Sequence, residues 1–216
     1  MNLTSELEMA EFASTLIHTR RNISPRRLVA PGPSALQLQD ILGAAATAPD
    51  HGRLQPWRFI IVPANQRERL ADVFGLALLD RDPNASGFQI ERAREKAHRA
   101  PFLMLAVARL VEPVTPVKPL PDLYGQNSHA MEPDVPDVER LVSFGCAIQN
   151  MLLAAHAAGF GAGLTSGQAM ASLRMRALFS LQPNECPVCC LNIGTATKYK
   201  PEQLRPRIAD YISDLI

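Results

Sequence analysis

The sequence has no apolar stretch near the roughly 18 uncharged residues that a transmembrane helix needs; its longest apolar run covers residues 102–108. Lysine is scarce, because the 22 basic residues are all arginine except Lys96, Lys118, Lys198 and Lys200. The formal net charge is only +1, which argues against nucleic acid or an anionic membrane as the main partner. Residues 1–10 are acidic and do not resemble a signal peptide, so we expect a cytoplasmic protein.

The four cysteines form neither a disulfide pattern nor a metal-binding pattern. Cys186, Cys189 and Cys190 contain one C-x-x-C, but a zinc site needs a second pair of ligands, and the sequence has no other C-x-x-C. Cys146 lies in a separate apolar run. We therefore interpret these residues as reduced, buried thiols and expect no metal.

Motifs of hydrolases, kinases and dinucleotide-binding proteins are missing as well. The chain has no G-x-S-x-G, Walker loop or H-E-x-x-H. A G-x-G-x-x-G in the glycine-dense residues 159–167 would require glycine where Leu164 or Ser166 stands, and this segment follows a predicted helix rather than a strand. The segment is either a helix end followed by a turn, or a loop whose backbone approaches a ligand.

The composition and length fit one globular domain. Of the 216 residues, 47% are hydrophobic and 20% charged, and about 70% of the surface of a chain of this size can be buried. No shift in composition marks a boundary, so we predict a single domain over residues 1–216. Apolar spacing predicts helices over residues 5–19, 34–47, 65–79, 89–99, 138–158 and 169–179, and strands over 57–62, 102–111 and 188–194. Without regular β-α-β alternation, this order indicates an α+β fold.

Local signals set several helix ends. Capping boxes of the form S-x-x-E or S-x-x-Q begin at Ser5 and Ser34, Asp137 is placed to cap the long helix, and Gly159 is suited to end it. We expect the apolar stripe of the first helix to be buried; it consists of Met9, Phe12, Ala13, Leu16 and Ile17.

A proline-rich segment, residues 112–137, separates the third strand from the long helix. It holds six prolines and cannot be a regular element. We predict a lid or insert loop that contacts the substrate through Tyr124, Asn127 and His129. The alternative is an excursion into solvent.

Two polar segments are candidate sites. Residues 20–27 hold four arginines, which form a solvated turn, a nucleic-acid-binding arm that the neutral net charge disfavours, or a phosphate clamp together with Asn22. His51 lies between charged neighbours in an irregular loop and is a better site candidate than His156, which we expect in the core or an interface.

Three segments together resemble the nitroreductase family of FMN enzymes. They are LIHTRRNIS at residues 16–24, APDHGRLQPWRF at residues 48–59, and the long-helix sequence SFGCAIQNMLLAA with its exit GFG, within residues 143–161. The Asp-His form of the second segment is typical of the YdjA-like branch. The resemblance implies an α+β fold with a central mixed sheet flanked by helices, an interlocked homodimer, and FMN at the dimer interface.

The resemblance also implies where the cofactor is bound. Arg20, Arg21 and Asn22 would hold the phosphate and the pyrimidine side of the flavin, and Arg205 and Arg207 resemble a C-terminal basic pair that binds phosphate in many members. Arginine suits a phosphate dianion because its guanidinium binds two oxygens at once.

Two further segments would complete the cofactor site. The first reaches the flavin from the other chain and consists of Thr47, Pro49, Asp50, His51 and Arg53. The second lies along the ring edge, with a backbone N–H near the flavin N5, and consists of Leu164, Thr165, Ser166 and Gly167.

The implied activity is an FMN-dependent oxidoreductase. NADH or NADPH would deliver a hydride to flavin N5, and a nitroaromatic, quinone or similar acceptor would then take it in a ping-pong reaction. No catalytic side chain is required, because the cofactor carries the chemistry. The alternatives are a specialised flavin reaction on the same fold, such as enone reduction, dehalogenation or flavin fragmentation, and a flavin-binding protein without turnover.

Overall fold

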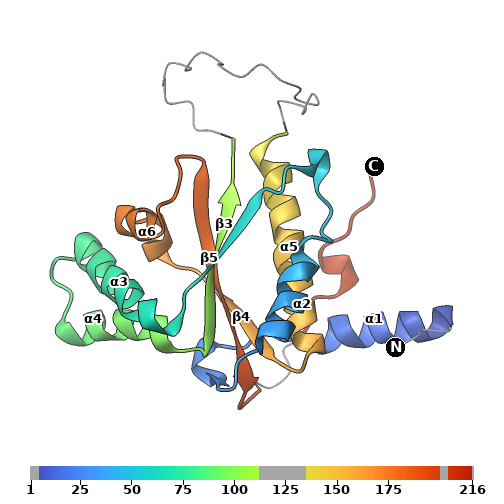
Figure 1. Ribbon diagram of the computed structural model, residues 1–216. Helices are drawn as coiled ribbons and strands as arrows, with labels where there is room; N and C mark the ends of the chain where they lie inside the picture. The colour runs from blue at the N-terminus through green and yellow to red at the C-terminus, as the bar shows by residue number, and fades with distance from the viewer. Residues whose placement is uncertain (1–4, 112–134, 200–203, 216) are drawn as a thin grey trace.

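The computed structural model describes residues 5–111, 135–199 and 204–215 (Figure 1). An α+β fold is confirmed, with five strands in one sheet. The strands are β1 (Leu28–Val29), β2 (Trp57–Ile61), β3 (Phe102–Arg109), β4 (Gly161–Thr165) and β5 (Glu185–Ala196). Their order is β1-β5-β3-β2, and β4 also pairs with β5. Every pair of these strands is antiparallel, and parallel pairing in the described residues is limited to a bridge between Asn22 and Ala162.

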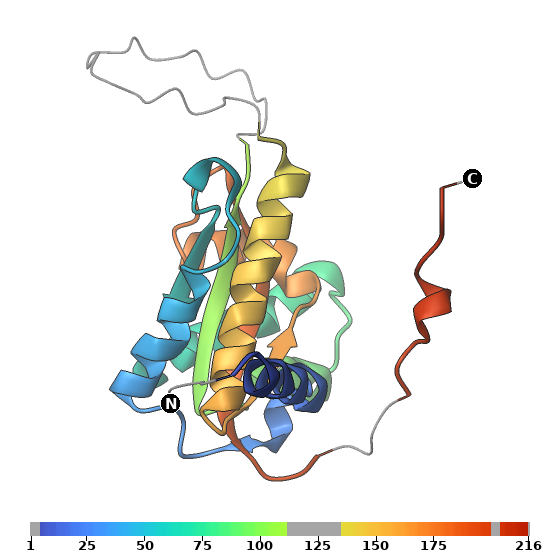
Figure 2. The same ribbon diagram turned by 90° about the vertical axis from the view of Figure 1, so that its right-hand side faces the viewer.

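The helices lie on both faces of this sheet (Figures 1 and 2). They are α1 (Glu6–Thr19), α2 (Ala35–Ala45), α3 (Arg67–Arg81), α4 (Gly87–Arg94), α5 (Asp137–Ala157) and α6 (Leu173–Leu178). No helix in the described ranges is both long enough and apolar enough to cross a membrane.

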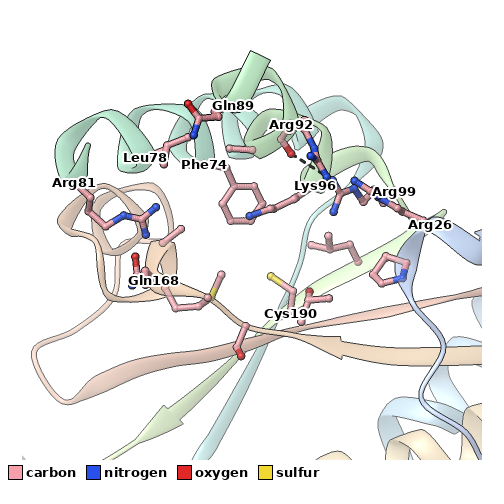
Figure 3. Close-up of a pocket in the computed structure, with 18 residues that line it drawn as sticks. Arg26, Phe74, Leu78, Arg81, Gln89, Arg92, Lys96, Arg99, Gln168 and Cys190 are labelled. Atoms are coloured by element: carbon pink, nitrogen blue, oxygen red, sulfur yellow. Dashed lines mark hydrogen bonds between the residues drawn. The ribbon is translucent and has the colours of Figure 1, made fainter. Parts of the chain in front are cut away.

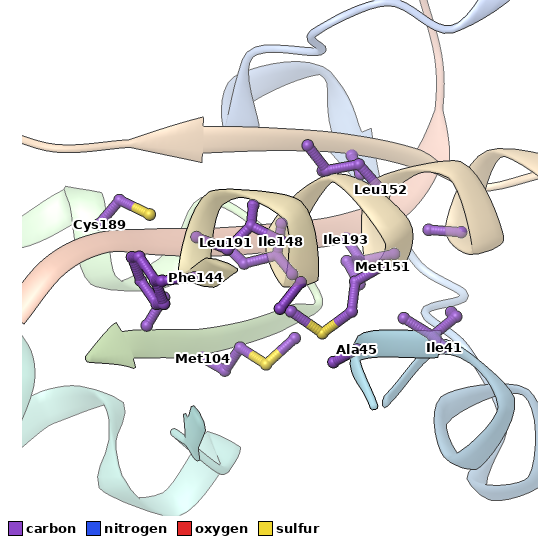
Figure 4. Close-up of a cluster of buried hydrophobic side chains, with 14 of the residues drawn as sticks. Ile41, Ala45, Met104, Phe144, Ile148, Met151, Leu152, Cys189, Leu191 and Ile193 are labelled. Carbon is purple, nitrogen blue, oxygen red and sulfur yellow. The ribbon is translucent and has the colours of Figure 1, made fainter. Parts of the chain in front are cut away.

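Strand β3 is apolar from Phe102 to Ala108 because both of its faces are covered there. Met104, Ala106 and Ala108 point to the α2 and α5 side, where they pack with Met151 and Phe144 of α5 (Figure 4). Residues 103, 105 and 107 point to the opposite face, into a second core built largely by α3 and α6. The strand therefore joins two hydrophobic cores, as the alternation of side chains along a strand requires.

Serine is the N-cap residue of several helices. Ser5 accepts a hydrogen bond from the Glu8 backbone N–H (3.2 Å), and Ser34 forms the complete capping box with Gln37 that the sequence predicts. A box at Ser86 and Gln89, which we did not predict, begins α4 at Gly87 rather than at residue 89. Gly159 ends α5 in the left-handed region (φ +83°), as predicted.

Two expectations about helices are wrong. The apolar stripe of α1 is not buried, because α1 has no buried residue and exposes 44% of Phe12 and 56% of Ile17. Figure 1 shows why: α1 projects sideways from the end of α5 and does not lie across the sheet. Asp137 is the first residue of α5 and not its cap; its carboxylate accepts a hydrogen bond from the Val111 backbone N–H (2.7 Å).

The glycine-dense segment forms a strand, β4, where we predicted a turn or loop. A Cβ atom at Gly163 would lie 2.0 Å from the Ile23 carbonyl oxygen, so only glycine lets residues 22–23 pack against β4. The segment leaves the sheet at Thr165, and residues 166–167 form a short loop. The alternative in which this backbone approaches a ligand stays a prediction.

Residues 112–134 lie outside the described residues. The prediction of a lid loop over residues 112–137, and of substrate contacts through Tyr124, Asn127 and His129, therefore stays a prediction. The described end of this segment is anchored, because Val135 is buried.

Candidate functional site

Strand β4 brings together two of the predicted cofactor-binding segments. The Ile23 backbone N–H donates to the Ala162 carbonyl (2.9 Å), and the Leu164 backbone N–H donates to the side-chain oxygen Oδ1 of Asn22 (3.1 Å). Residues 20–22 and 164–167 are thus neighbours across more than 140 residues of sequence. The buried Asn192 of β5 holds the end of β4, since its Nδ2 donates to Thr165 Oγ1 (3.1 Å).

Positive charge gathers beside the start of β4. Thr19 Oγ1 lies 2.8 Å from His156 Nε2 at the end of α5. Burial, and next the charge of Arg205, lowers the pKa of Arg20 below its ordinary value. Burial, and next the charge of Arg20, lowers the pKa of His156 as well. Arg20, Arg21 and His156 also line a small cavity of about 10 Å³.

The structure distinguishes between the two C-terminal arginines. Arg205 lies close enough to Arg20 to affect its pKa, whereas Arg207 is bound to its own helical turn. The Arg207 guanidinium donates to Asp210 Oδ1 (3.1 Å), and 85% of its side chain is exposed. Arg205, and not Arg207, therefore joins the cationic group at Arg20.

A cavity of about 650 Å³ lies beside the other end of β4 (Figure 3). Thr165, Ser166 and Gly167 form part of its wall, and Phe74, Leu78 and Met170 supply apolar surface. Its basic lining residues are Arg26, Arg81, Arg92, Lys96 and Arg99, and none of the described lining residues is acidic. A volume of this size is typical of small-molecule sites.

The basic lining of this cavity was not predicted from the sequence. Burial lowers the pKa of Lys96, and the charges of Arg99, Arg81 and Arg92 lower it further, in that order. In the sequence these residues look like the solvated face of a charged helix. One available signal was the i, i+4, i+7 spacing of Arg92, Lys96 and Arg99, which puts them on one helix face.

Buried Arg67 supports one wall of the cavity without lining it, and of the two buried cysteines of β5 only Cys190 lines it. The guanidinium of buried Arg67 donates to the carbonyl oxygens of Val62 (2.8 Å), Ala97 (2.7 Å) and Ala100 (3.1 Å), which ties α3 to the segment that carries Lys96. Burial raises the pKa of the Cys189 thiol to about 11. It raises that of Cys190, which lines the cavity, to about 12. These two thiols are thus protonated. All four cysteines are free, but Cys146 and Cys186 are only half-buried, where we expected buried thiols.

The loop after α2 holds the third predicted segment. Asp50 Oδ2 accepts a hydrogen bond from the Gln55 backbone N–H (2.7 Å), but its Oδ1 is buried and has no partner in the described part of the chain. His51 Nδ1 lies 2.6 Å from Glu139 Oε2 at the start of α5. Thr47 Oγ1 donates to the Ala44 carbonyl (2.8 Å) and accepts from Asn150 Nδ2 (3.1 Å).

Within one chain this loop does not join the other two segments. His51 is attached to Glu139 near the start of α5, and Thr19 is attached to His156 near its end. These two positions are seventeen residues apart, or about 26 Å along the helix axis. Pro49 and Arg53 lie in the same distant loop, at the upper end of α5 in Figure 1.

Comparisons with known proteins bear on the family and the fold. The model of the Nitroreductase family matches residues 17–195. An Escherichia coli protein named "Putative NAD(P)H nitroreductase YdjA" is 34% identical over 85% of this chain and 87% of its own length. That relative belongs to the branch that the Asp-His motif indicated.

Solved structures share the fold. The nitroreductase-like family protein of Bacillus cereus has a TM-score of 0.73 at 17% identity, and the match covers 100% of this chain and 98% of the other. A Desulfovibrio desulfuricans protein described as a "putative nitroreductase in complex with FMN" has a TM-score of 0.63 at 22% identity over 94% of this chain and 96% of the other. Sequence motifs, fold and family model thus agree: the chain belongs to the nitroreductase family, as the resemblance predicted.

Proposed function

We propose that this protein is an FMN-dependent oxidoreductase that passes a hydride from NADH or NADPH to a nitroaromatic, quinone or similar acceptor. The observation that carries the proposal is the hydrogen bond between Asn22 and Leu164. This bond holds the arginine-rich segment beside strand β4, which leads into the glycine-containing loop. One group of cations lies at each end of β4.

The group at Arg20 fits the phosphate of FMN. Two guanidinium groups and a histidine stand close together there, and the charges of Arg205 and Arg20 disfavour the protonated forms of their neighbours. A phosphate dianion would offset this repulsion and accept charge-assisted hydrogen bonds. Arg20 and Arg205 would hold it, with Arg21 at the wall of the adjoining small cavity.

The large cavity fits the flavin ring. A Cβ atom at Gly167 would have no heavy atom within 4 Å, so the loop presents open space and not packed protein at this point. Lys96 extends into the cavity (Figure 3) and would lie beside the part of the ring that becomes negative on reduction. Backbone N–H groups of residues 165–167 would border the ring edge.

The protein's exposed apolar surface supports a homodimer that completes the site. The α1 stripe is exposed, and so are the apolar side chains near the C-terminus: Leu204, Ile208, Tyr211, Ile212 and Leu215. In Figure 2 this C-terminal segment lies apart from the helices and the sheet. A second copy would cover these surfaces and bring its own Pro49–Arg53 loop, with the unpaired Asp50 Oδ1, to the cofactor.

Bound FMN would supply the redox chemistry, accepting a hydride at N5 and delivering it to the acceptor. For a nitro group the balanced two-electron reaction is ArNO₂ + NAD(P)H + H⁺ → ArNO + NAD(P)⁺ + H₂O. The chain's own residues bind and orient: Arg20 and Arg205 hold the phosphate, and Asn22 fixes the loop beside the ring. Lys96 stabilises negative charge in the cavity.

The experiment is purification followed by anaerobic reduction. We expect a yellow protein that binds FMN in preference to FAD, loses its flavin absorbance with NADH or NADPH, and regains it with nitroaromatics or quinones. A colourless protein in excess FMN would contradict cofactor binding. A yellow protein that neither nucleotide reduces would indicate a flavin-binding protein without this activity.

A further inference from the structure

The large cavity holds more positive charge than FMN requires. Its lining contains five basic residues. The phosphate of FMN has its own cationic group at the other end of β4, and one cation, Lys96, matches the single negative charge of a reduced ring. Four arginines remain in the cavity wall: Arg26, Arg81, Arg92 and Arg99.

Protein carboxylates neutralise little of this charge. Arg81 and Arg26 have no ion pair within the described residues, and Arg92 stacks on the ring of Phe88 at 5.6 Å. Arg99 is paired only with Glu95, one helical turn away on the surface, at 3.8 Å. Its pKa is lowered by burial and next by the charge of Arg26. The cluster therefore repels itself, and an anion inside the cavity would relieve the repulsion.

The arrangement of these cations suits a flat ligand with an acidic group. Figure 3 shows Lys96 between Arg81 on one side and Arg92 and Arg99 on the other, above the loop that carries Gln168. Phe74, Leu78 and Met170 offer an apolar surface for an aromatic ring within the same cavity. An arginine pair binds a carboxylate or phosphate well because each guanidinium donates two parallel hydrogen bonds.

We propose that Arg92 and Arg99, which lie together on one side of Lys96 and are joined by a hydrogen bond from the Arg99 guanidinium to the Arg92 carbonyl, bind an acidic group, a carboxylate or phosphate, on the electron acceptor. The physiological acceptor is then an anionic aromatic compound. This inference rests on the proposed function, since it assigns the substrate class of the same site. The 2′-phosphate of NADPH has the same chemistry and is the other possible source of the anion.

The test compares two acceptors that differ in charge. 4-Nitrobenzoate and 4-nitrobenzyl alcohol share the nitro group, but only the first carries a carboxylate. The readout is the ratio of their kcat/KM values with saturating NADH, for the wild type and for the double variant Arg92→Gln, Arg99→Gln. Arg69→Gln is the matched control, because Arg69 lies on α3 outside the cavity, where it bonds to Gln66.

We expect the wild type to prefer the benzoate, less strongly as salt is added, because screening weakens charge attraction. In the double variant the ratio should fall roughly 10- to 100-fold, the effect of losing a charged hydrogen bond. Arg69→Gln should leave it unchanged. An unchanged ratio in the double variant, or no preference in the wild type, would overturn the proposal.

Two further measurements identify the source of the anion. If the double variant slows anaerobic reduction by NADPH but not by NADH, and leaves the acceptor ratio unchanged, the cavity binds the nucleotide 2′-phosphate and the acceptor proposal is wrong. If the variant weakens binding of FMN but not of riboflavin, the cluster holds the cofactor phosphate, which also overturns it. Failure of the proposed function is separate, because it would appear as a wild type that binds no flavin or is not reduced.

Discussion

Replacement of Arg20 by alanine tests the phosphate site. Arg20 is half-buried at the end of α1 and close to Arg205 and His156. A charged hydrogen bond contributes about 1.5–3 kcal/mol, so we expect Arg20→Ala to raise the dissociation constant of FMN by roughly 10- to 150-fold. Affinity for riboflavin, which lacks the phosphate, should change little.

In the protein without FMN, the same substitution should change the pKa of His156. The Arg20 charge contributes, after burial, to the low pKa of His156, so Arg20→Ala should raise that pKa toward its ordinary value of 6.5. In the wild type, addition of FMN should raise it for the same reason, because the phosphate offsets the Arg20 charge. Riboflavin should not. Titration of the imidazole by NMR, with and without each ligand, measures the effect.

Flavin affinity is measured by the quenching of flavin fluorescence on binding. Arg27→Ala is the control, because Arg27 lies in the same arginine-rich segment but lines neither cavity. Arg26 is not a suitable control, since it lines the large cavity. An equal loss of FMN and riboflavin affinity in Arg20→Ala would refute the assignment of Arg20 to the phosphate.

Three further predictions follow from other parts of the structure. Gly167→Val should fold normally, because the backbone there is extended (φ 168°) and a Cβ meets open space. Its flavin affinity, measured by titration, should nevertheless fall at least tenfold. Gly43→Val, on the exposed side of α2, is the control and should leave flavin affinity unchanged. For Glu185, burial favours the neutral form, but hydrogen bonds from the Gln182 backbone N–H and Arg58 outweigh it and lower its pKa below 4.5. The stability that this carboxylate contributes is therefore present above about pH 4.5 and is lost as the pH falls through the lowered value; Glu185→Gln should cost about 1.5–3 kcal/mol in urea unfolding at pH 7 and remove that part of the acid dependence. The FMN-bound protein should sediment as a dimer at micromolar concentration, and a flavin-bound monomer would contradict the shared site. At free FMN 100 times its dissociation constant, the free energy of unfolding should be about 2.7 kcal/mol higher than without FMN.

Several parts of this protein depend only on neighbours along the chain, and these could be predicted from the residues alone. The capping box at Ser34, the left-handed helix end at Gly159 and the apolar strand β3 are written in local patterns, and each is found where it was predicted. The family was also readable, because the motif around Gln55, Pro56 and Trp57 is specific enough to identify it.

Features that depend on distant partners could not be predicted in this way and became visible in the folded chain. The apolar period of α1 specified an apolar face, but not what covers it, and the described residues of this chain leave most of it exposed. The glycines of β4 looked like a turn, because their requirement is a close approach by Ile23, about 140 residues earlier. The cation-lined cavity was invisible for the same reason: Arg26, Arg81 and Arg92 come from separate elements, and their charges converge only when those elements pack around one space.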